Sequence, residues 1–313
     1  MLILIRPHLV RAPRVQARFM ATEKELKKRI TSVQSIRKIT KASKMVAAAK
    51  LRGVQNMLLI GRKFSAPAIN IWKSEEDKKA EAEEAAKRAS DKNYVITREM
   101  SPDAVTMLVP MTSDRGLCGG INSSVVRLTR RLVHDNEERS PPILCLGERG
   151  RSALSRSHGY LFSSALVDIS KQVVPTFEQA MAVASIFLQQ KFDSALLISN
   201  RFKSAIAYDT NLQDVPSVQK RLANTGPLAA YECEGDETVT YTNLAEFSIA
   251  LTFYHAMLEN NTTEQSQKMS AMENSTKNAG ELIESLKIEY NRSRQARITT
   301  ELIEIISGAA ALD

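Results

Sequence analysis

Residues 269–293 read MSAMENSTKNAGELIESLKIEYNRS, and their spacing decides the fold of the C-terminal part of the chain. Apolar, small or weakly polar residues recur there at alternating steps of 3 and 4, at Met269, Met272, Thr276, Ala279, Ile283, Leu286, Tyr290 and Ser293. Heptad spacing of this kind predicts a helix that pairs with a second helix in a left-handed supercoil. Because no proline occurs from Thr242 onward, the pattern predicts one helix over 242–313, roughly 100 Å long at 1.5 Å per residue.

The N-terminal part of the chain supplies the expected partner helix, over residues 21–73. Its first proline is Pro67, and Leu26, Ile30, Val33, Ile36 and Ile39 recur at helical steps and line one face. Between residues 21 and 64 there are twelve Lys or Arg and two Glu, so this helix is strongly basic. The small residues of 46–49 let another helix approach closely. We expect the two terminal helices to pair antiparallel, because the intervening domain can return the chain to its starting point.

Strand and helix patterns alternate through residues 102–241. Strands are predicted at 104–111, 141–146, 160–169, 194–199 and 204–208, and helices at 119–136, 148–157 and 175–190, the last with Thr176 as its N-cap. Such alternation predicts an α/β layer with a mainly parallel sheet. The fold class is therefore mixed α+β and α/β: a long antiparallel coiled coil of the N- and C-terminal helices, with an inserted Rossmann-like α/β domain.

Two further segments differ in composition from these three. Residues 1–20, MLILIRPHLVRAPRVQARFM, contain four arginines and no acidic residue, which is typical of a mitochondrial transit peptide. Removal is expected near residues 18–21; a retained terminal arm is the alternative. Residues 74–101 form a charged insertion or linker with few large apolar residues, which we expect to be solvated.

Composition excludes several classes of function. The formal charge is +8, from 43 Lys and Arg against 35 Asp and Glu, but aromatic residues make up only 5 %, which argues against a nucleic-acid stacking surface. No uncharged apolar run approaches the roughly 20 residues of a membrane span. Three widely spaced cysteines and four scattered histidines form neither a zinc motif nor a catalytic cluster. The sequence therefore predicts no catalytic residue, no metal site and no cofactor.

Two stretches could still carry chemistry. The stretch 112–122 follows a predicted strand, where phosphate sites occur in doubly wound sheets, but it lacks the lysine and glycine spacing of a phosphate-binding loop. A tight turn with exposed Asp114 and Arg115 is favoured, and Cys118 is only a weak candidate for a reactive thiol. Glu301 and Glu304 lie three residues apart on one helix face, where a solvated edge is favoured over acid–base work.

The last predicted turns of the C-terminal helix are apolar around much of their circumference. Ile298, Leu302, Ile305 and Ile306, with Ile303, form this apolar tip, and Arg292, Arg294, Arg297 and Gln295 precede it. An exposed surface of this kind aggregates unless a partner encloses it. The sequence therefore predicts that the C-terminal end of the helix inserts into a partner.

At this point the chain resembles one family closely, the γ subunits that form the central shaft of rotary F-type ATP synthases. The motif Ile298-Thr-x-Glu-x-x-Glu-x-x-x-Gly308-Ala-x-Ala311 matches the family signature, and Arg294-Gln295-Ala296 precedes it. Further matches are the stretches 278–286, 289–291, 37–42, 44–51 and 113–120. The resemblance covers residues 21–313 in one order.

The resemblance implies a mitochondrial transducer with no active site of its own. Its antiparallel helices would pass through a ring of three α and three β subunits and couple proton-driven rotation to conformational cycling of the catalytic β subunits during ATP synthesis. By resemblance, Lys268, Arg294, Gln295 and Thr299 engage the β-subunit catch loops, and the apolar tip turns inside an apolar collar.

The same resemblance assigns further partners and a place in the cell. The α/β domain would form a foot that contacts the δ and ε shaft subunits and the c-ring, on the matrix side of the inner mitochondrial membrane, peripheral and without a span of its own. The rival interpretations are a coiled-coil scaffold, a nucleic-acid binder and a nucleotide-using enzyme. Micromolar ATP binding by the isolated chain would favour the last of these.

Overall fold

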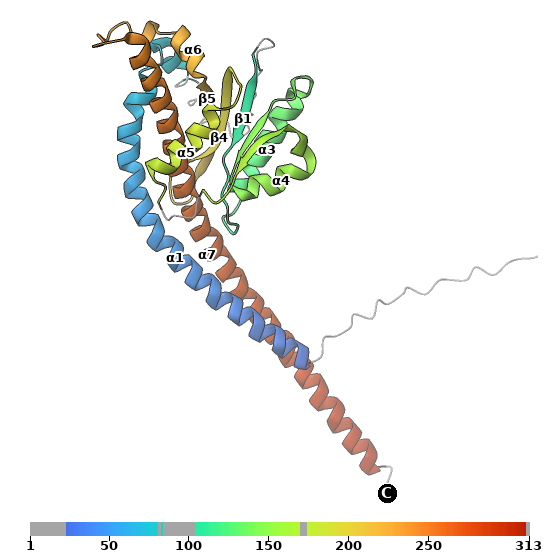
Figure 1. Cartoon of the computed structure of the whole chain (residues 1–313). Helices are drawn as coiled ribbons and strands as arrows, with labels where there is room; N and C mark the ends of the chain where they lie inside the picture. The colour runs from blue at the N-terminus through green and yellow to red at the C-terminus, as the bar shows by residue number, and fades with distance from the viewer. Residues whose placement is uncertain (1–22, 81–82, 84–99, 101–103, 170–173, 311–313) are drawn as a thin grey trace, which may run out of the picture. The chain divides into compact units, whose positions relative to one another are not determined.

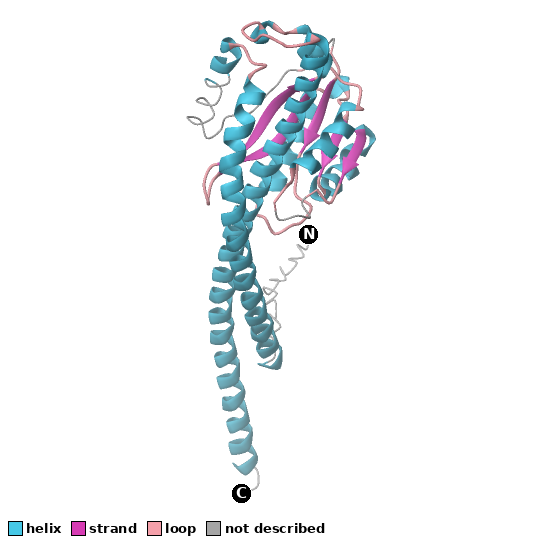
Figure 2. Ribbon diagram, turned by 60° about the vertical axis from the view of Figure 1, so that its left-hand side comes forward, coloured by secondary structure: helices cyan, strands magenta, loops and turns pink. Residues whose placement is uncertain are grey.

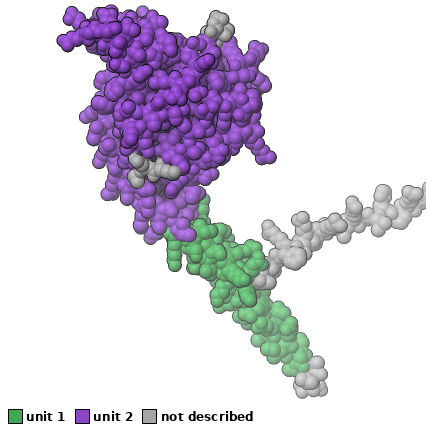
Figure 3. All heavy atoms as spheres, in the orientation of Figure 1, with its two compact units in different colours: residues 1–38, 277–313 green, residues 39–276 purple. Residues whose placement is uncertain are grey.

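The chain folds into two compact units. The computed structural model describes residues 23–80, 83, 100, 104–169 and 174–310. Residues 39–276 form one unit, called here the sheet unit, and residues 1–38 with 277–313 form the other, the terminal unit (Figure 3). The long helices α1 (Glu23–Asn70) and α7 (Glu237–Ala310) contribute residues to both units (Figure 1).

A five-stranded sheet lies in the sheet unit. Its strands are β1 (Thr106–Pro110), β2 (Ile143–Leu146), β3 (Phe162–Leu166), β4 (Ser194–Phe202) and β5 (Tyr208–Pro216). They are arranged in the order β3-β2-β1-β4-β5, with all neighbours parallel except β5, which is antiparallel to β4. The strand order reverses at β1, so the loop that follows β1 leaves the sheet at a topological switch point. The predicted Rossmann-like α/β domain is confirmed.

Helices cover both faces of this sheet (Figure 2). They are α3 (Ile121–Asp135), α4 (Glu148–His158) and α5 (Phe177–Leu188). Because successive residues of a strand point to opposite faces, Leu108 of β1 packs with Val125 of α3, whereas Met107 packs with Phe187 of α5. Phe253 of α7 packs in the same core as Met107 and Phe187, and its ring centroid lies 5.0 Å from that of Phe187.

Within the sheet unit, α1 and α7 run antiparallel, as predicted. Their contacting pairs are Lys44 with Glu273, Arg62 with Glu259, and Ala68 with Ser248, so residue numbers fall in α7 as they rise in α1. Gly61 of α1 allows close approach, because a Cβ atom there would lie only 2.5 Å from Cδ1 of Leu258 in α7. The helices also bury Leu51, Val54 and Leu58 of α1.

Within the terminal unit, the first turns of α1 pack on α7 along the predicted heptad seam. Leu26 of α1 is buried, as are the seam residues Ala279, Ile283 and Leu286 of α7. Their neighbour Leu282 remains half exposed, because it lies off the seam. The same seam continues in the sheet unit, where Met272 is buried. The predicted period of α7 is confirmed.

Several local predictions need correction. A strand at 204–208 is wrong: residues 204–207 form the turn between β4 and β5, in which Ser204 N–H donates to the carbonyl oxygen of Ala207 (2.9 Å). The hydroxyl oxygen of Ser204 also accepts from the N–H of Ala207 (3.1 Å), so the serine favours the turn over a strand.

The predicted cap at Thr176 is confirmed as a capping box. Helix α7 begins at Glu237, and the short helix α6 (Val218–Ala223) had no counterpart in the prediction.

Some predictions fall outside the described residues. These are the leader at 1–20, its removal near 18–21, and most of the charged insertion at 74–101. Of this insertion the structure describes residues 74–80, 83 and 100. Residues 75–80 are helical and exposed, as expected, whereas Met100 is buried in the core that contains Leu108.

Candidate functional site

The exposed surface of the last turns of α7 is the first candidate site. Every residue of 294–309 is exposed, including the apolar tip residues Ile298, Leu302, Ile303, Ile305 and Ile306 with exposed fractions of 49–71 %. Fully burying such a side chain contributes about 1.5–3 kcal/mol. The surface therefore offers several kcal/mol to a partner that encloses it.

A polar cluster marks where the helix pair of the terminal unit ends. The carboxylate of Glu23, at the start of α1, accepts from the hydroxyl of Tyr290 (2.9 Å) and pairs with Nε of Arg297 (2.9 Å). The hydrogen bond to Glu23 raises the pKa of Tyr290. Since α1 begins at Glu23, α7 continues past Arg297 without cover from any described residue of α1. The apolar tip starts at the next residue, Ile298.

Arg294, Gln295 and Thr299 lie together immediately before and within this exposed stretch. All three are exposed, and the Thr299 hydroxyl donates to the carbonyl oxygen of Gln295 (2.9 Å), one turn earlier. At 3.6 residues per turn, the three side chains occupy roughly 140° of the helix circumference. They present a guanidinium, an amide and a hydroxyl to one side of α7, which suits hydrogen bonding to acidic or carbonyl groups of a partner.

Lys268, the fourth residue predicted to engage a partner, lies in the sheet unit and has a different environment. Its ammonium group is paired with the buried carboxylate of Glu264, one turn earlier on α7. Burial raises the pKa of Glu264, and the charge of Lys268 opposes that rise. The structure therefore groups Arg294, Gln295 and Thr299, but it places Lys268 in a separate pair. The contact of all four with catch loops remains a prediction.

Polar residues of α7 just before Lys268 are buried, which sequence reasoning missed. All eight residues of 259–266 are polar, and each is at most 8 % exposed. They find partners on other elements: Asn260 accepts from Nδ2 of Asn200 at the end of β4 (3.0 Å), and the Ser266 hydroxyl donates to the carbonyl oxygen of Ala205 (2.6 Å). A polar run on a helix gives no sign of such burial unless the partner loops are known.

The loop after β1 is a second candidate surface. The predicted tight turn is confirmed, because Leu117 and Gly119 both have φ of +64°, which favours glycine. The side chain of Asn122 ties the loop together by accepting from Ser113 N–H (2.9 Å) and donating to the Ser113 hydroxyl oxygen (2.8 Å). The loop thereby holds the apolar side chain of Leu117 out, 77 % exposed.

Two expectations for this loop are corrected. Asp114 is half-buried rather than exposed, because its Oδ1 accepts from the N–H of Glu148 (3.1 Å), at the N-terminus of α4, and of Asp168 (3.0 Å). Cys118 is buried, and burial raises the pKa of its thiol, so the reactive thiolate is disfavoured. Arg115 is exposed, as expected. The exposure of Leu117 was not predicted from the sequence. The one feature that could have indicated it is the presence of a large apolar residue inside a glycine-containing turn.

Metal binding is not supported by the described residues. No cluster of three or more His, Cys, Asp or Glu side chains among them could hold a metal ion. Nor does any helix among these residues combine the length and apolar character of a membrane span. Glu301 lies on the exposed end of α7 with a long contact to Arg297 (3.5 Å), which fits a solvated edge.

Comparison with known proteins identifies the family of the chain. A family model described as "ATP synthase" matches residues 22–312. The ATP synthase gamma chain of Paramagnetospirillum magneticum is 38 % identical over 303 residues, covering 94 % of this chain and 100 % of that protein.

Solved structures of similar fold come from mitochondrial ATP synthases. A chain of the Tetrahymena thermophila central stalk and c-ring structure is 33 % identical with a TM-score of 0.58, covering 75 % of this chain and 98 % of that one. A chain of the Euglena gracilis OSCP/F1/c-ring structure has a TM-score of 0.68 at 19 % identity, covering 93 % and 94 %, and supports the fold. With its full-length match to a curated γ chain and its exposed helical end, this chain belongs to the ATP synthase γ-chain family.

Proposed function

We propose that the chain is the central rotor shaft of a mitochondrial F-type ATP synthase, which couples proton-driven rotation to conformational cycling of the catalytic β subunits. One observation carries the proposal: α7 continues beyond the start of α1 as an exposed helix whose apolar tip is uncovered by any described residue of its own unit. An exposed helix end with a broad apolar face requires a partner that covers this face. A ring of α and β subunits is such a partner.

Coupling in this proposal depends on differences between the sides of the shaft. A shaft that contacted every β conformation equally would change no equilibrium, however tightly it bound. Shifting a site from 1:99 to 99:1 in favour of tight binding requires about 5.5 kcal/mol of differential contact. The grouping of Arg294, Gln295 and Thr299 within roughly 140° of α7 supplies one such difference, because a β subunit on that side meets hydrogen-bonding groups and one on another side does not.

The chain itself performs no bond-making step in this proposal. ATP forms at the β subunits, and the γ chain acts as a non-catalytic element of a proton-translocating complex. Lys268 is proposed as a further catch contact. To make it, its ammonium group would have to exchange Glu264 for a β-subunit carboxylate or carbonyl group.

The remaining assignments concern place and organisation. Residues 1–20 are proposed as the transit peptide, 21–73 and 242–313 as the shaft helices, 74–101 as an exposed insertion, and 102–241 as the foot. The foot would contact the δ and ε shaft subunits and the c-ring on the matrix side of the inner membrane. The acid-free, arginine-containing leader supports the mitochondrial location.

The test is reconstitution of the full chain with α and β subunits. Arg294→Ala combined with Gln295→Ala is expected to lower ATP hydrolysis by the ring several-fold, because the shaft loses two hydrogen-bonding groups that differ between its sides. Lys287→Ala combined with Asn291→Ala is the matched control, since both residues are exposed on the same helix and this pair also loses one positive charge and one side-chain amide. Turnover unchanged by the first pair would remove it from the contact set, and failure of the wild-type chain to assemble with α and β would overturn the proposed function.

A further inference from the structure

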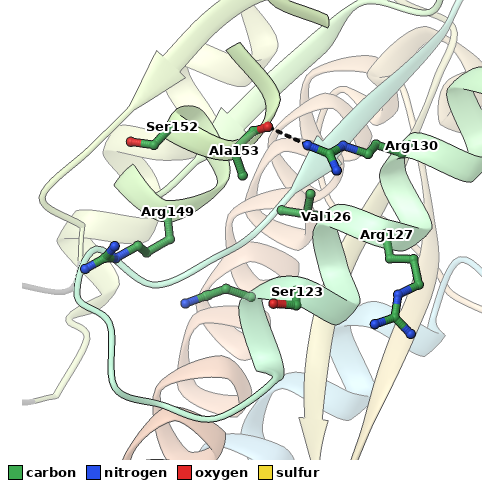
Figure 4. A pocket seen from close by; sticks show the side chains of 8 residues that line it. Ser123, Val126, Arg127, Arg130, Arg149, Ser152 and Ala153 are labelled. Atoms are coloured by element: carbon green, nitrogen blue, oxygen red, sulfur yellow. Dashed lines mark hydrogen bonds between the residues drawn. The ribbon is translucent and has the colours of Figure 1, made fainter. Parts of the chain in front are cut away.

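A groove between α3 and α4 contains three arginines, none of which takes part in the contacts described above. It has a volume of about 600 Å³ and is open to solvent. Figure 4 shows the side chains that line it. Arg127 and Arg130 of α3 and Arg149 of α4 line it, together with the polar side chains of Asn122, Ser123 and Ser152. None of its lining residues is acidic.

One of the three arginines is held in place by a hydrogen bond, and a second lies close to the loop after β1. The guanidinium of Arg130 reaches from α3 to α4 and donates to the carbonyl oxygen of Ala153 (2.7 Å; Figure 4). Arg149 lies over Gly116, with its Nη2 only 2.7 Å from the position that a Cβ atom would take. Since the Arg130 side chain is already positioned, an incoming anion orders fewer side-chain torsions on binding.

The nearest acidic side chain on α4 does not neutralise the groove. Both oxygens of Glu148 accept from Arg151, at 2.8 Å each, and Oε1 also accepts from the hydroxyl of Ser152 (2.7 Å). Hydrogen bonds from Arg151 and Ser152 lower the pKa of Glu148 to about 2, and the charge of Arg149 contributes less, so the Glu148 carboxylate is engaged mainly by Arg151. Within the described part of the chain, Arg127, Arg130 and Arg149 form no ion pair with an acidic side chain at 4.0 Å or less.

We propose that the α3–α4 groove binds an anion that carries more than one phosphate group. Arginine presents five N–H donors in a planar fork that matches phosphate oxygens, and its hydrogen bonds to phosphate are charge-assisted. The groove volume falls within the range of about 300–1,000 Å³ typical of small-molecule sites, so it accommodates more than a single phosphate. Val126 and Ala153 provide a small apolar floor between the arginines. Such an anion is either a soluble diphosphate compound or the headgroup of a phospholipid with two phosphates.

The first test is calorimetric titration of the full chain with inorganic pyrophosphate at constant ionic strength. Saturable binding is expected, and Arg127→Gln combined with Arg149→Gln should weaken it by about tenfold or more, because two charge-assisted donors are lost. Arg131→Gln combined with Arg156→Gln is the control. It makes the same change in net charge on the same two helices at exposed positions outside the groove, and should change affinity by less than about twofold.

The second test uses sedimentation with vesicles that contain cardiolipin, whose headgroup carries two phosphates, against vesicles of phosphatidylcholine alone. Loss of cardiolipin binding in the groove variant, but not in the control, identifies a lipid headgroup as the source. Pyrophosphate binding without vesicle binding identifies a soluble anion.

Two results overturn the proposal: no saturable binding of either probe, or equal weakening by the groove and control variants. Should the double groove variant fail to fold, the single substitution Arg127→Gln at an exposed position replaces it, and the same comparison applies with Arg131→Gln.

Discussion

Replacing Glu259 by glutamine should destabilise the sheet unit by about 2–3 kcal/mol. The carboxylate of Glu259 on α7 accepts from Nε (2.7 Å) and Nη2 (3.0 Å) of Arg62 on α1. Its Oε2 also accepts from the backbone N–H of Phe202 at the end of β4 (2.8 Å). The Glu259 side chain is 4 % exposed and that of Arg62 is 34 % exposed. One carboxylate thus joins α1, α7 and the sheet.

The magnitude follows from what glutamine cannot replace. Breaking a buried ion pair by removing one partner costs about 3–5 kcal/mol, because the other charge is left uncompensated. Arg62 is one-third exposed and can recover part of its hydration, which reduces the expected loss to about 2–3 kcal/mol. The amide of glutamine also places a donor where two donors of Arg62 and the Phe202 N–H require an acceptor.

The assay is equilibrium unfolding in denaturant, followed by the fluorescence of Trp72. This is the chain's one tryptophan, and it belongs to the sheet unit, where its indole N–H donates to the Ser248 hydroxyl (2.9 Å). Glu273→Gln is the matched control: it makes the same chemical change on the same helix, but its pair with Lys44 is exposed and contributes about 0.2–1 kcal/mol. If the two variants lose the same free energy of unfolding, the reasoning about burial is refuted.

Three further predictions concern other parts of the chain. Burial lowers the pKa of His255 from 6.5, so the folded state binds fewer protons than the unfolded state. The free energy of unfolding should therefore fall as the pH falls below about 6.5, by up to about 1.4 kcal/mol at pH 5.5. This pH dependence should be shallower in His255→Gln. Gly61→Ala should lower the free energy of unfolding by about 1–2 kcal/mol, because the new methyl group meets the buried side chain of Leu258. Gly53→Ala, where no atom lies within 4 Å of the new methyl group, should raise it by about 0.5–1 kcal/mol. Equal effects of the two substitutions in denaturant unfolding would contradict the close approach of α1 and α7 at Gly61. Deleting residues 298–313 should change the free energy of unfolding by less than about 1 kcal/mol, because the deleted side chains that the structure describes are exposed. The same deletion should weaken assembly with the α and β subunits in a binding assay. A truncated chain that no longer folds would show that these side chains belong to its own core.

The sequence predicted those features whose pattern repeats along one element. The heptad steps of α7 identified its packing face, because the residues that lie on one side of a helix are fixed by its 3.6-residue period. The apolar tip was predictable for the same reason, since isoleucine and leucine that recur on one broad face of an exposed helix indicate a surface for a partner. Alternation of strands and helices in turn predicted the largely parallel sheet.

What the sequence did not reveal depends on contacts between elements distant in the chain. The polar residues 259–266 look like a solvated helix face, yet they are buried because Arg62, Asn200 and Ala205 provide their partners. Strand β5 was missed because the residues before it form a turn, and its pairing with β4 depends on that turn. The groove of three arginines forms only when α3 and α4 lie side by side. Arg127 and Arg130 lie on α3 and Arg149 lies on α4, and β2 separates these two helices in the chain.

The central claim is that this chain rotates inside a ring of α and β subunits, and direct observation of that rotation tests it. A probe attached through Ser155→Cys, exposed on α4, in a Cys233→Ser background labels one position, because Cys118 and Cys145 are buried. With the ring fixed to a surface and supplied with ATP, the account predicts that the probe turns in one direction with three resting orientations, one for each β subunit. A probe that stays still while the same ring hydrolyses ATP would contradict it.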